Sequence, residues 1–214
     1  MKLYGNPFSC ALASNIVLKE LDLETDYAWV QLSTKQTTEG EDYFAINPKG
    51  KVPALVLGDG TVLSEGVAVM QFLADENPQV GLLPPPGTAA RAKATEWLVY
   101  LATELHKKIF YPVFNPGAPR DAKSFAMSML PEELSYIEAT LSEQDYIAGD
   151  EFTPADAYLV TILNWAGFLK TDLSAYPATT AYQAKVIQRP SVAAAFAQER
   201  TLYESHAQLR PDAA

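Results

Sequence analysis

The single cysteine of this 214-residue chain, Cys10, is the first candidate for chemistry. It follows a short strand-like stretch at residues 2–5 and a turn at Asn6-Pro7, so it lies where a helix is expected to begin. A thiolate at that position faces unpaired backbone N–H groups and the positive end of the helix dipole, which both stabilise the charged form. The alternative is a small structural side chain, because free cysteine is usually buried.

Two dipeptides could bind a peptide-like ligand. Val52-Pro53 precedes a predicted hairpin strand. If that bond is cis, the Val52 backbone is turned outward and can pair with an extended peptide; an ordinary turn proline is the alternative. Glu65-Gly66 opens a predicted helix, whose N–H groups suit a ligand carboxylate while Glu65 could contact a ligand ammonium. The alternative for Glu65 is that an acidic residue simply favours the first turn of a helix.

Other polar side chains are weaker candidates. His106 lies on a long predicted helix, where it shares a face with Thr103 and Val99 beside an apolar stripe. It could therefore face a ligand, or it could be structural. Ser9 and Tyr4 lie near Cys10 in the sequence and could donate a hydrogen bond to a bound thiolate. The sequence contains no spacing typical of metal ligands, so we expect no metal.

The composition narrows the class of partner. With 16 Lys and Arg against 26 Asp and Glu, the formal net charge is −10, and no basic stripe exists that would attract nucleic acid. No apolar run approaches the 18 residues of a membrane span, and the first residues lack the apolar segment of a secretory signal. One cysteine cannot form an internal disulfide. We therefore expect a cytoplasmic protein without a membrane or nucleic-acid partner.

The first 80 residues alternate between strand-like stretches and helices. A strand–helix–strand unit requires a right-handed crossover, and a strand–strand–helix unit follows, joined by the hairpin signal Gly58-Asp59-Gly60. This order predicts an α/β domain with a thioredoxin-like layout. We expect strands at residues 2–5, 27–32, 54–57 and 61–63, helices at 10–21, 43–46 and about 65–77, and a loop at 33–42.

Prolines separate this part from an all-α remainder. Pro78 and the run Pro84-Pro85-Pro86 stiffen the connection, because each proline fixes φ and removes an N–H donor. We find no convincing strand after Thr88. We expect helices at residues 89–111, 121–143, 153–169, 176–187 and 190–199, and a loosely held tail from residue 201. The sequence therefore predicts a first domain at 1–80, a linker at 81–87 and an all-helical domain at 88–214.

Thr153-Pro154-Ala155-Asp156 is typical of a helix start. Thr153 can cap the helix, Pro154 suits the first turn, and Asp156 can bond back to the capping residue. The helix that follows is apolar nearly all round and should be buried, so its terminal N–H groups need partners. We interpret Asp156 as structural; a catalytic carboxylate is the alternative.

Taken together, these residues resemble the cytosolic glutathione transferases, and most closely the bacterial beta class. The resemblance runs from residue 1 to about 160, and the ordered series is specific, whereas no single motif would be. The matching stretches are residues 1–3 followed by Cys10, 42–50 (DYFAINPKG), 52–55 (VPAL), 65–71 (EGVAVMQ), 96–98 (EWL), 102–107 (ATELHK) and 152–158 (FTPADAY).

The resemblance implies a homodimer of subunits with a thioredoxin-like domain and a helical domain, and glutathione as cosubstrate in the cleft between the domains. By analogy, the Val52 backbone pairs with the cysteinyl unit beside a cis Pro53. Glu65 and Gly66 hold the γ-glutamyl end, and Lys35 holds the glycyl carboxylate.

The resemblance also implies the catalytic side chains. Cys10 faces the sulfur and His106 lines the cleft near it, while Thr103 and Glu104 reach the ligand of the neighbouring subunit. A small hydrophobic electrophile would be held against the helical domain. The candidate side chains there, each of which could equally be core, are Phe110, Tyr111, Phe114 and Trp165.

The implied activity is the detoxifying conjugation of glutathione to small electrophiles, with glutathione-dependent thiol–disulfide or peroxide chemistry as a second possibility through Cys10. A non-catalytic glutathione-binding carrier is the alternative from another class. Three positions depart from the beta-class pattern: Ala11, Asn15 and Val99 stand where that class often has Ser, His and Asn.

Overall fold

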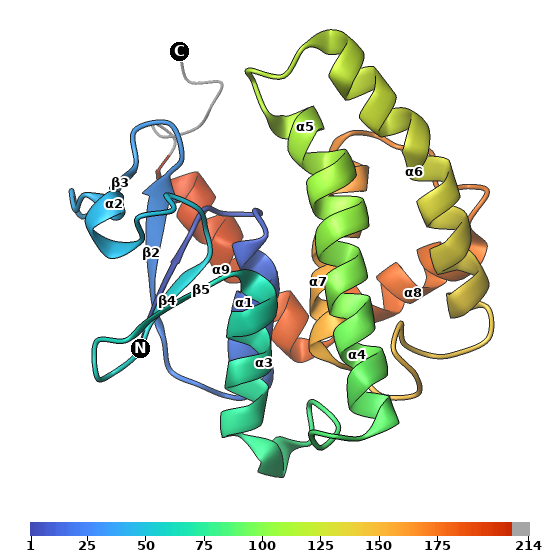
Figure 1. Ribbon diagram of the computed structural model, residues 1–214, viewed down its shortest axis with the longest axis horizontal. Helices are drawn as coiled ribbons and strands as arrows, with labels where there is room; N and C mark the ends of the chain where they lie inside the picture. Colours follow the sequence, from blue (N-terminus) through green and yellow to red (C-terminus); the bar gives the residue numbers. More distant parts are fainter. Residues whose placement is uncertain (207–214) are drawn as a thin grey trace. The chain divides into compact units, whose positions relative to one another are not determined.

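The computed structural model describes residues 1–206 (Figure 1). Its contacts divide the chain into two compact units, which are described separately. Unit 1 contains Met1–Gly81 together with residues 189–206, and unit 2 is Leu82–Gln188. The division at residue 80 and the linker at 81–87 stay predictions. Residues 189–206, however, group with the first unit and not, as we expected, with the preceding helices.

Unit 1 is built on a five-stranded sheet of order β3-β2-β1-β4-β5. Strand β1 pairs in parallel with β2 and antiparallel with β4, and the β4–β5 hairpin closes one edge. This is the mixed topology predicted from the strand–helix–strand and strand–strand–helix order. The elements of unit 1 are β1 (Lys2–Gly5), α1 (Ala11–Glu20), β2 (Asp26–Gln31), β3 (Gln36–Thr37), α2 (Tyr43–Ile46), β4 (Ala54–Val56), β5 (Val62–Ser64), α3 (Gly66–Glu76), the 3-10 turn Pro78–Val80 and α9 (Pro190–Ser205).

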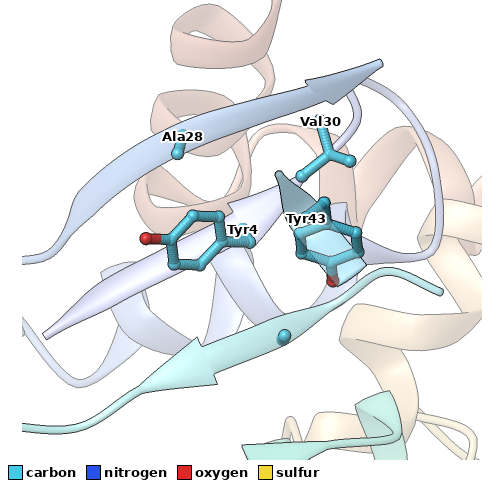
Figure 2. Packing of buried hydrophobic residues seen from close by; sticks show 5 residues of the cluster. Tyr4, Ala28, Val30 and Tyr43 are labelled. Carbon is cyan, nitrogen blue, oxygen red and sulfur yellow. The ribbon is translucent and has the colours of Figure 1, made fainter. Parts of the chain in front are cut away.

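One face of the sheet is covered by α2. Tyr43 of this helix is fully buried against Tyr4 of β1, and Ala28 and Val30 of β2 complete the cluster with Ala54 (Figure 2). Successive side chains of a strand point to opposite faces, so Leu3 and Leu55 are buried on the other side. Helix α1 packs there against β1 and contacts both α3 and α9.

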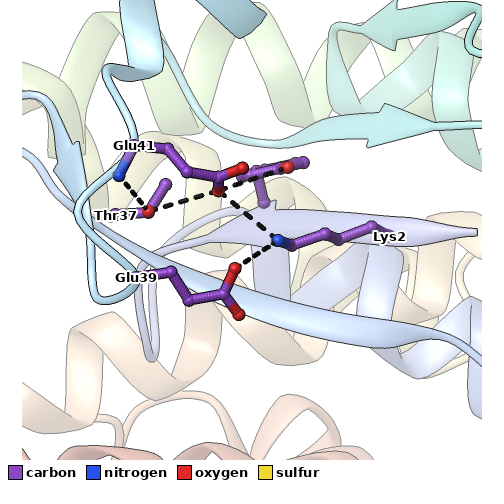
Figure 3. Close-up of polar contacts among 5 residues, drawn as sticks. Lys2, Thr37, Glu39 and Glu41 are labelled. Carbon is purple, nitrogen blue, oxygen red and sulfur yellow. Dashed lines mark hydrogen bonds and ion pairs between the residues drawn. The ribbon is translucent and has the colours of Figure 1, made fainter.

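The polar stretch predicted as a loop, residues 33–42, contains the short strand β3. Two side chains around it, Glu39 and Glu41, pair with Lys2 of β1 at 2.6 and 3.4 Å (Figure 3). Thr37 accepts a hydrogen bond from the Glu41 N–H and donates one to its carboxylate. The loop prediction was wrong here because Gln36 and Thr37 pair antiparallel with β2 across a short turn, although the segment lacks the apolar alternation typical of a strand.

Helix α9 extends to Ser205, six residues beyond the predicted end at 199. Tyr203 stacks on Trp29 of β2 at a ring distance of 6.2 Å, and the ring of His206 lies 5.5 Å from the same indole. The expectation of a loosely held tail is therefore wrong for residues 201–206. The rest of that tail, 207–214, lies outside the described residues.

Unit 2 is helical, and its described residues contain no strand, as predicted. The first helix is capped by Thr88, whose hydroxyl accepts a hydrogen bond from the Arg91 N–H. The elements are α4 (Ala89–Tyr100), the π-helix Leu101–Phe110, α5 (Tyr111–Phe114), α6 (Arg120–Leu141), α7 (Pro154–Phe168) and α8 (Pro177–Ile187).

The long helix predicted at residues 89–111 changes period within its length. Its apolar stripe is buried as expected, but from Leu101 to Phe110 the backbone is a π-helix, which has a wider turn. Pro112 follows and lacks the N–H that a regular helix would use in the next turn. Face assignments made with a period of 3.6 residues therefore fail in this segment.

The start of α7 is the capping box that the sequence predicted. The buried Asp156 carboxylate accepts hydrogen bonds from the Thr153 N–H and hydroxyl, from the Ile147 N–H and from the Tyr182 hydroxyl, at 2.8 to 2.9 Å. Burial raises the pKa of Asp156, and these four donors act against that rise. The structure thus assigns Asp156 to the architecture of unit 2.

Candidate functional site

Cys10 is the residue that immediately precedes α1, as predicted. Its side chain is partly buried, and the thiol donates a hydrogen bond to the backbone carbonyl of Val52 at 3.2 Å. The helix start and the turn before β4, separated by 42 positions, thus meet at the Cys10 sulfur. Tyr4, the other donor considered, is directed elsewhere, because its hydroxyl donates to Glu41.

The Val52–Pro53 bond is cis, as the sequence interpretation required. The turn before it is fixed by two side chains that donate to the Lys51 carbonyl, the Tyr43 hydroxyl and the Asn47 amide, both at 2.7 Å. Both donors are buried, so these two hydrogen bonds hold the turn before Val52 in place.

Glu65 and Gly66 lie at the start of α3, where free N–H groups can meet an anion. Glu65 has a φ of 69°, a left-handed conformation that is uncommon for a residue with a side chain. A Cβ on Gly66 would lie 3.6 Å from the Pro53 ring, in ordinary contact. The predicted carboxylate-binding helix start and the cis proline are therefore neighbours.

Lys35 also has a left-handed backbone, with a φ of 59°. Its ammonium donates to the carbonyl of Gly50 at 2.8 Å, two residues before Val52. Cys10, Lys35, Val52, Glu65 and Gly66 all belong to unit 1, and the structure gathers them around the segment from residue 50 to 66.

A buried carboxylate supports the turn that carries Cys10. Glu199 of α9 accepts a hydrogen bond from the Phe8 N–H at 2.6 Å and one from the Asn15 amide at 3.3 Å. Burial raises the pKa of Glu199 to about 8, and these donors act against the rise. Burial, together with the Glu199 charge, also raises the pKa of Tyr27. Sequence analysis missed Glu199, although a charged residue among the apolar positions of a predicted helix was a usable signal.

His106 belongs to unit 2 and faces α7. Its Nδ1 lies 2.6 Å from the hydroxyl of Tyr158, and its ring lies 5.0 Å from that of Trp165. Burial, and secondarily the charge of Lys107, lowers the pKa of His106 to about 3. The ring is therefore neutral at physiological pH. Tyr158 was read from the sequence only as part of a buried helix.

Thr103 and Glu104 make different contacts from His106. The Thr103 hydroxyl donates to the carbonyl of Val99, and both side chains are exposed. Glu104 pairs with Lys108 at 2.9 Å. The expectation that His106 shares a face with Thr103 and Val99 is wrong, because the π-helix turns His106 toward the interior of unit 2.

The aromatic residues considered for an electrophile divide into two groups. Phe110 and Trp165 are buried in the core of unit 2, with rings 5.6 Å apart. Tyr111 and Phe114 are each 41% exposed. Of these four side chains, only the second pair, in α5 after the π-helix, offers accessible aromatic surface.

Residues 1–206 contain neither a cluster of metal-binding side chains nor a membrane-spanning helix. Among these residues, no three His, Cys, Asp or Glu side chains are grouped so that they could hold a metal ion. Within residues 1–206, no helix combines the length and the apolar character that a membrane crossing needs.

Two protein-family models match this chain. Residues 9–76 match the family described as "Glutathione S-transferase, N-terminal domain", and residues 101–190 match "Glutathione S-transferase, C-terminal domain". The glutathione S-transferase GstA of Escherichia coli O157:H7 is 44% identical over 199 residues, which cover 93% of this chain and 98% of that protein.

Solved structures agree. A sphingomonad glutathione S-transferase complexed with glutathione superimposes with a TM-score of 0.89 at 38% identity, covering 94% of this chain and 99% of the other. The bacterial beta class glutathione S-transferase of Sphingomonas chungbukensis gives a TM-score of 0.89 at 39% identity, covering 93% and 98%. The chain therefore belongs to the glutathione S-transferase family, and its solved relatives include a member of the bacterial beta class.

Proposed function

We propose that this protein conjugates the thiolate of glutathione to small hydrophobic electrophiles. The observation that carries the proposal is the cis Val52–Pro53 bond, whose Val52 carbonyl lies 3.2 Å from the Cys10 sulfur. A backbone presented in this way can pair with an extended peptide and place the peptide's sulfur near the start of α1. The named transferases among its relatives favour an enzyme over a non-catalytic carrier.

The binding roles follow from the charges in unit 1. The Val52 backbone pairs with the cysteinyl unit of glutathione, and Lys35 binds the glycyl carboxylate. Glu65 binds the γ-glutamyl ammonium, and the N–H of Gly66 faces the γ-glutamyl carboxylate. From unit 2, His106 lies near the glutathione sulfur, while Thr103 and Glu104 reach the ligand of the second subunit in a homodimer.

The chemical task is to ionise the thiol. A thiol with a pKa of about 8.5 is only about 3% thiolate at pH 7. Lowering that pKa by roughly two units raises the fraction about 25-fold, which corresponds to about 2.7 kcal/mol of preferential stabilisation. The positive end of the α1 dipole supplies part of this stabilisation, because it lies beside the developing negative charge. The thiolate then attacks the electrophile.

A second activity, reduction of mixed disulfides, is favoured by the position of Cys10. In that reaction the Cys10 thiolate attacks a glutathione mixed disulfide and the other thiol leaves as its thiolate. A second glutathione thiolate then attacks the resulting Cys10–glutathione disulfide, releasing oxidised glutathione and restoring the Cys10 thiol. The sequence holds no second cysteine that could resolve this intermediate.

Replacing Cys10 separates the two activities. We expect Cys10→Ala to retain conjugation within about tenfold, because the start of α1 and the Val52 backbone that pairs with glutathione both remain. Disulfide reduction should fall to the background rate, because its nucleophile is gone. Steady-state rates with 1-chloro-2,4-dinitrobenzene and with a glutathione mixed disulfide measure both. Loss of conjugation together with disulfide reduction would show that Cys10 itself is needed to ionise glutathione.

The assembly and location remain part of the proposal. The enzyme acts as a homodimer in the cytoplasm, with glutathione as cosubstrate and without a metal, a membrane or a nucleic-acid partner. The exposed aromatic pair Tyr111 and Phe114 supports an apolar electrophile.

A further inference from the structure

A lysine that the sequence analysis passed over stands next to Glu65. The Lys49 ammonium lies 2.9 Å from the Glu65 carboxylate and 3.1 Å from the hydroxyl of Ser64. Both charged side chains are more than half exposed, at 53% and 65%. The pair therefore presents one positive and one negative charge to solvent, directly beside the start of α3.

The backbone on each side of the pair is held in place. The N–H of Lys49 donates to the side chain of the buried Asn47, and Gly50 follows with a φ of 58°. A Cβ on Gly50 would come within 2.6 Å of the Phe44 ring, so this turn is tightly packed. Glu65 is fixed in its left-handed conformation, and its carbonyl accepts the Val69 N–H as α3 begins. The backbones that carry Lys49 and Glu65 are therefore fixed, and both charged groups project from them toward solvent.

The ion pair has the dimensions of an amino-acid head group. In a zwitterionic α-amino acid the ammonium nitrogen and the nearer carboxylate oxygen are about 3 Å apart, because two covalent bonds separate nitrogen from the carboxyl carbon. A protein pair with an N–O distance of 2.9 Å can meet both charges at once, head to tail. The start of α3 adds N–H groups on the carboxylate side.

A polar side chain also lies beneath the start of α3. The Ser14 hydroxyl is buried without a hydrogen-bond partner, and it lies 3.9 Å from the point where a Cβ on Gly66 would stand. Because Ser14 is fully buried, its hydroxyl lies beneath the start of α3 and not on the surface that a ligand would meet.

We propose that Lys49 determines specificity for the γ-glutamyl end of glutathione by binding its α-carboxylate while Glu65 binds its α-ammonium. The proposal rests on glutathione being the cosubstrate, and it adds a residue to those assigned above. Lys49 and Glu65 act as one unit that recognises a free α-amino acid. A thiol peptide that lacks either charge leaves one member of the pair without its ligand partner.

A second role for Lys49 would have the opposite effect on glutathione binding. Lys49 could compete with the ligand ammonium for Glu65, in which case the ion pair must break before glutathione binds. The two roles predict opposite signs for the removal of the lysine: weaker binding if it holds the carboxylate, tighter binding if it is a competitor.

Three ligands and two variants distinguish these outcomes. Isothermal titration calorimetry of the full chain would measure the Kd of glutathione, of 4-aminobutanoyl-Cys-Gly, which lacks the α-carboxylate, and of glutaryl-Cys-Gly, which lacks the α-ammonium. We expect Lys49→Gln to raise the Kd of glutathione and of the glutaryl peptide about three- to tenfold, as for one partly exposed charge-assisted contact. The Kd of the 4-aminobutanoyl peptide should change by less than about twofold. Glu65→Gln should show the reverse selectivity.

A matched control exists in unit 2. Lys93 forms an ion pair with Glu96 at the same 2.9 Å and is also 53% exposed, so Lys93→Gln removes an equivalent charge and should leave all three Kd values unchanged. Lys49→Arg should retain the preference for the α-carboxylate. Equal losses for all three peptides, no change, or tighter binding of glutathione in Lys49→Gln would each overturn the proposal. Failure of the wild-type protein to bind glutathione would instead overturn the proposed function.

Discussion

At the scale of a residue, the state of His106 limits what it can contribute. Its ring is enclosed by Tyr158 and Trp165, and burial lowers its pKa to about 3. A neutral imidazole can exchange a hydrogen bond with the Tyr158 hydroxyl, but at neutral pH it supplies no positive charge to a thiolate. At neutral pH its chemistry is therefore limited to shape and hydrogen bonding.

Burial of neutral His106 makes stability depend on pH. In the unfolded chain its pKa is the ordinary 6.5, so between pH 6.5 and 3 the unfolded state binds more protons. Stability contributed by this residue is therefore lost as pH falls through that window, by about 2 kcal/mol between pH 7 and 5. We expect His106→Gln to remove this loss, measured by urea unfolding at both pH values.

The remaining histidine provides the control. His206→Gln, at the end of α9, should keep the wild-type difference between pH 7 and 5. If His106→Gln and the wild type lose equal stability over this interval, the pKa of His106 is the same in the folded and the unfolded protein.

At the scale of an element, carboxylates accept hydrogen bonds at the starts of α7 and α8, and the two carboxylates differ in burial. Asp156 receives four hydrogen bonds at the start of α7 and is fully buried. Glu138 receives three at the start of α8, from the Ala178 N–H and from the N–H and hydroxyl of Thr179, and it is partly exposed. Water can replace a lost acceptor at the second site but not at the first.

The two caps should therefore differ in their contribution to stability. We expect Asp156→Ala to lower the free energy of unfolding by about 3–5 kcal/mol, because four buried donors lose their acceptor. Glu138→Ala should cost about 1 kcal/mol, the usual value of a helix cap. Urea unfolding of both variants at pH 7 measures the difference. Similar losses in the two variants would contradict the role given to burial.

At the scale of the molecule, unit 1 is discontinuous in sequence, and Glu199 joins its two segments. This carboxylate receives the N–H of Phe8 across 191 positions of the chain, at 2.6 Å. It also bonds Asn15 of α1, one of the three positions that depart from the beta-class pattern. Helix α9 thus stabilises the turn that precedes Cys10.

Glu199 should give the protein a second pH dependence, opposite in sign to that of His106. Its folded pKa is raised from 4.5 to about 8, so stability present below pH 4.5 is lost as pH rises toward 8. The loss is about 1.4 kcal/mol per pH unit within that window. We expect Glu199→Gln to remove this slope while keeping an acceptor for Phe8. The measurement is the unfolding free energy of wild type and variant at pH 5, 6.5 and 8.

Parallel curves for wild type and Glu199→Gln would mean that Glu199 is ionised in the folded protein throughout. Glu204→Gln, also on α9 but exposed, is the control and should follow the wild type.

The parts of this structure that could be predicted are those written in local patterns. Strand alternation and helix periods predicted the order of elements, and Thr153 and Asp156 predicted the start of α7. The cis bond at Pro53 was expected through the family resemblance, since spacing alone left it open. Strand β3 pairs with the neighbouring β2 but has only two residues and no apolar alternation to mark it. The π-helix after Leu101 and the final turns of α9 depend on backbone packing or on contacts between distant residues. Pairs such as Lys49–Glu65 and Phe8–Glu199 become visible only when the fold brings them together.

The late position of α9 also has a consequence for biosynthesis. A ribosome makes the chain from its amino end, so all of unit 2 is synthesised before residues 189–206. Until then, Trp29 and the α9-facing side of α1 have no cover. The first unit can thus be completed only after the whole of unit 2 has been made, and until then it keeps an apolar face open to chaperones.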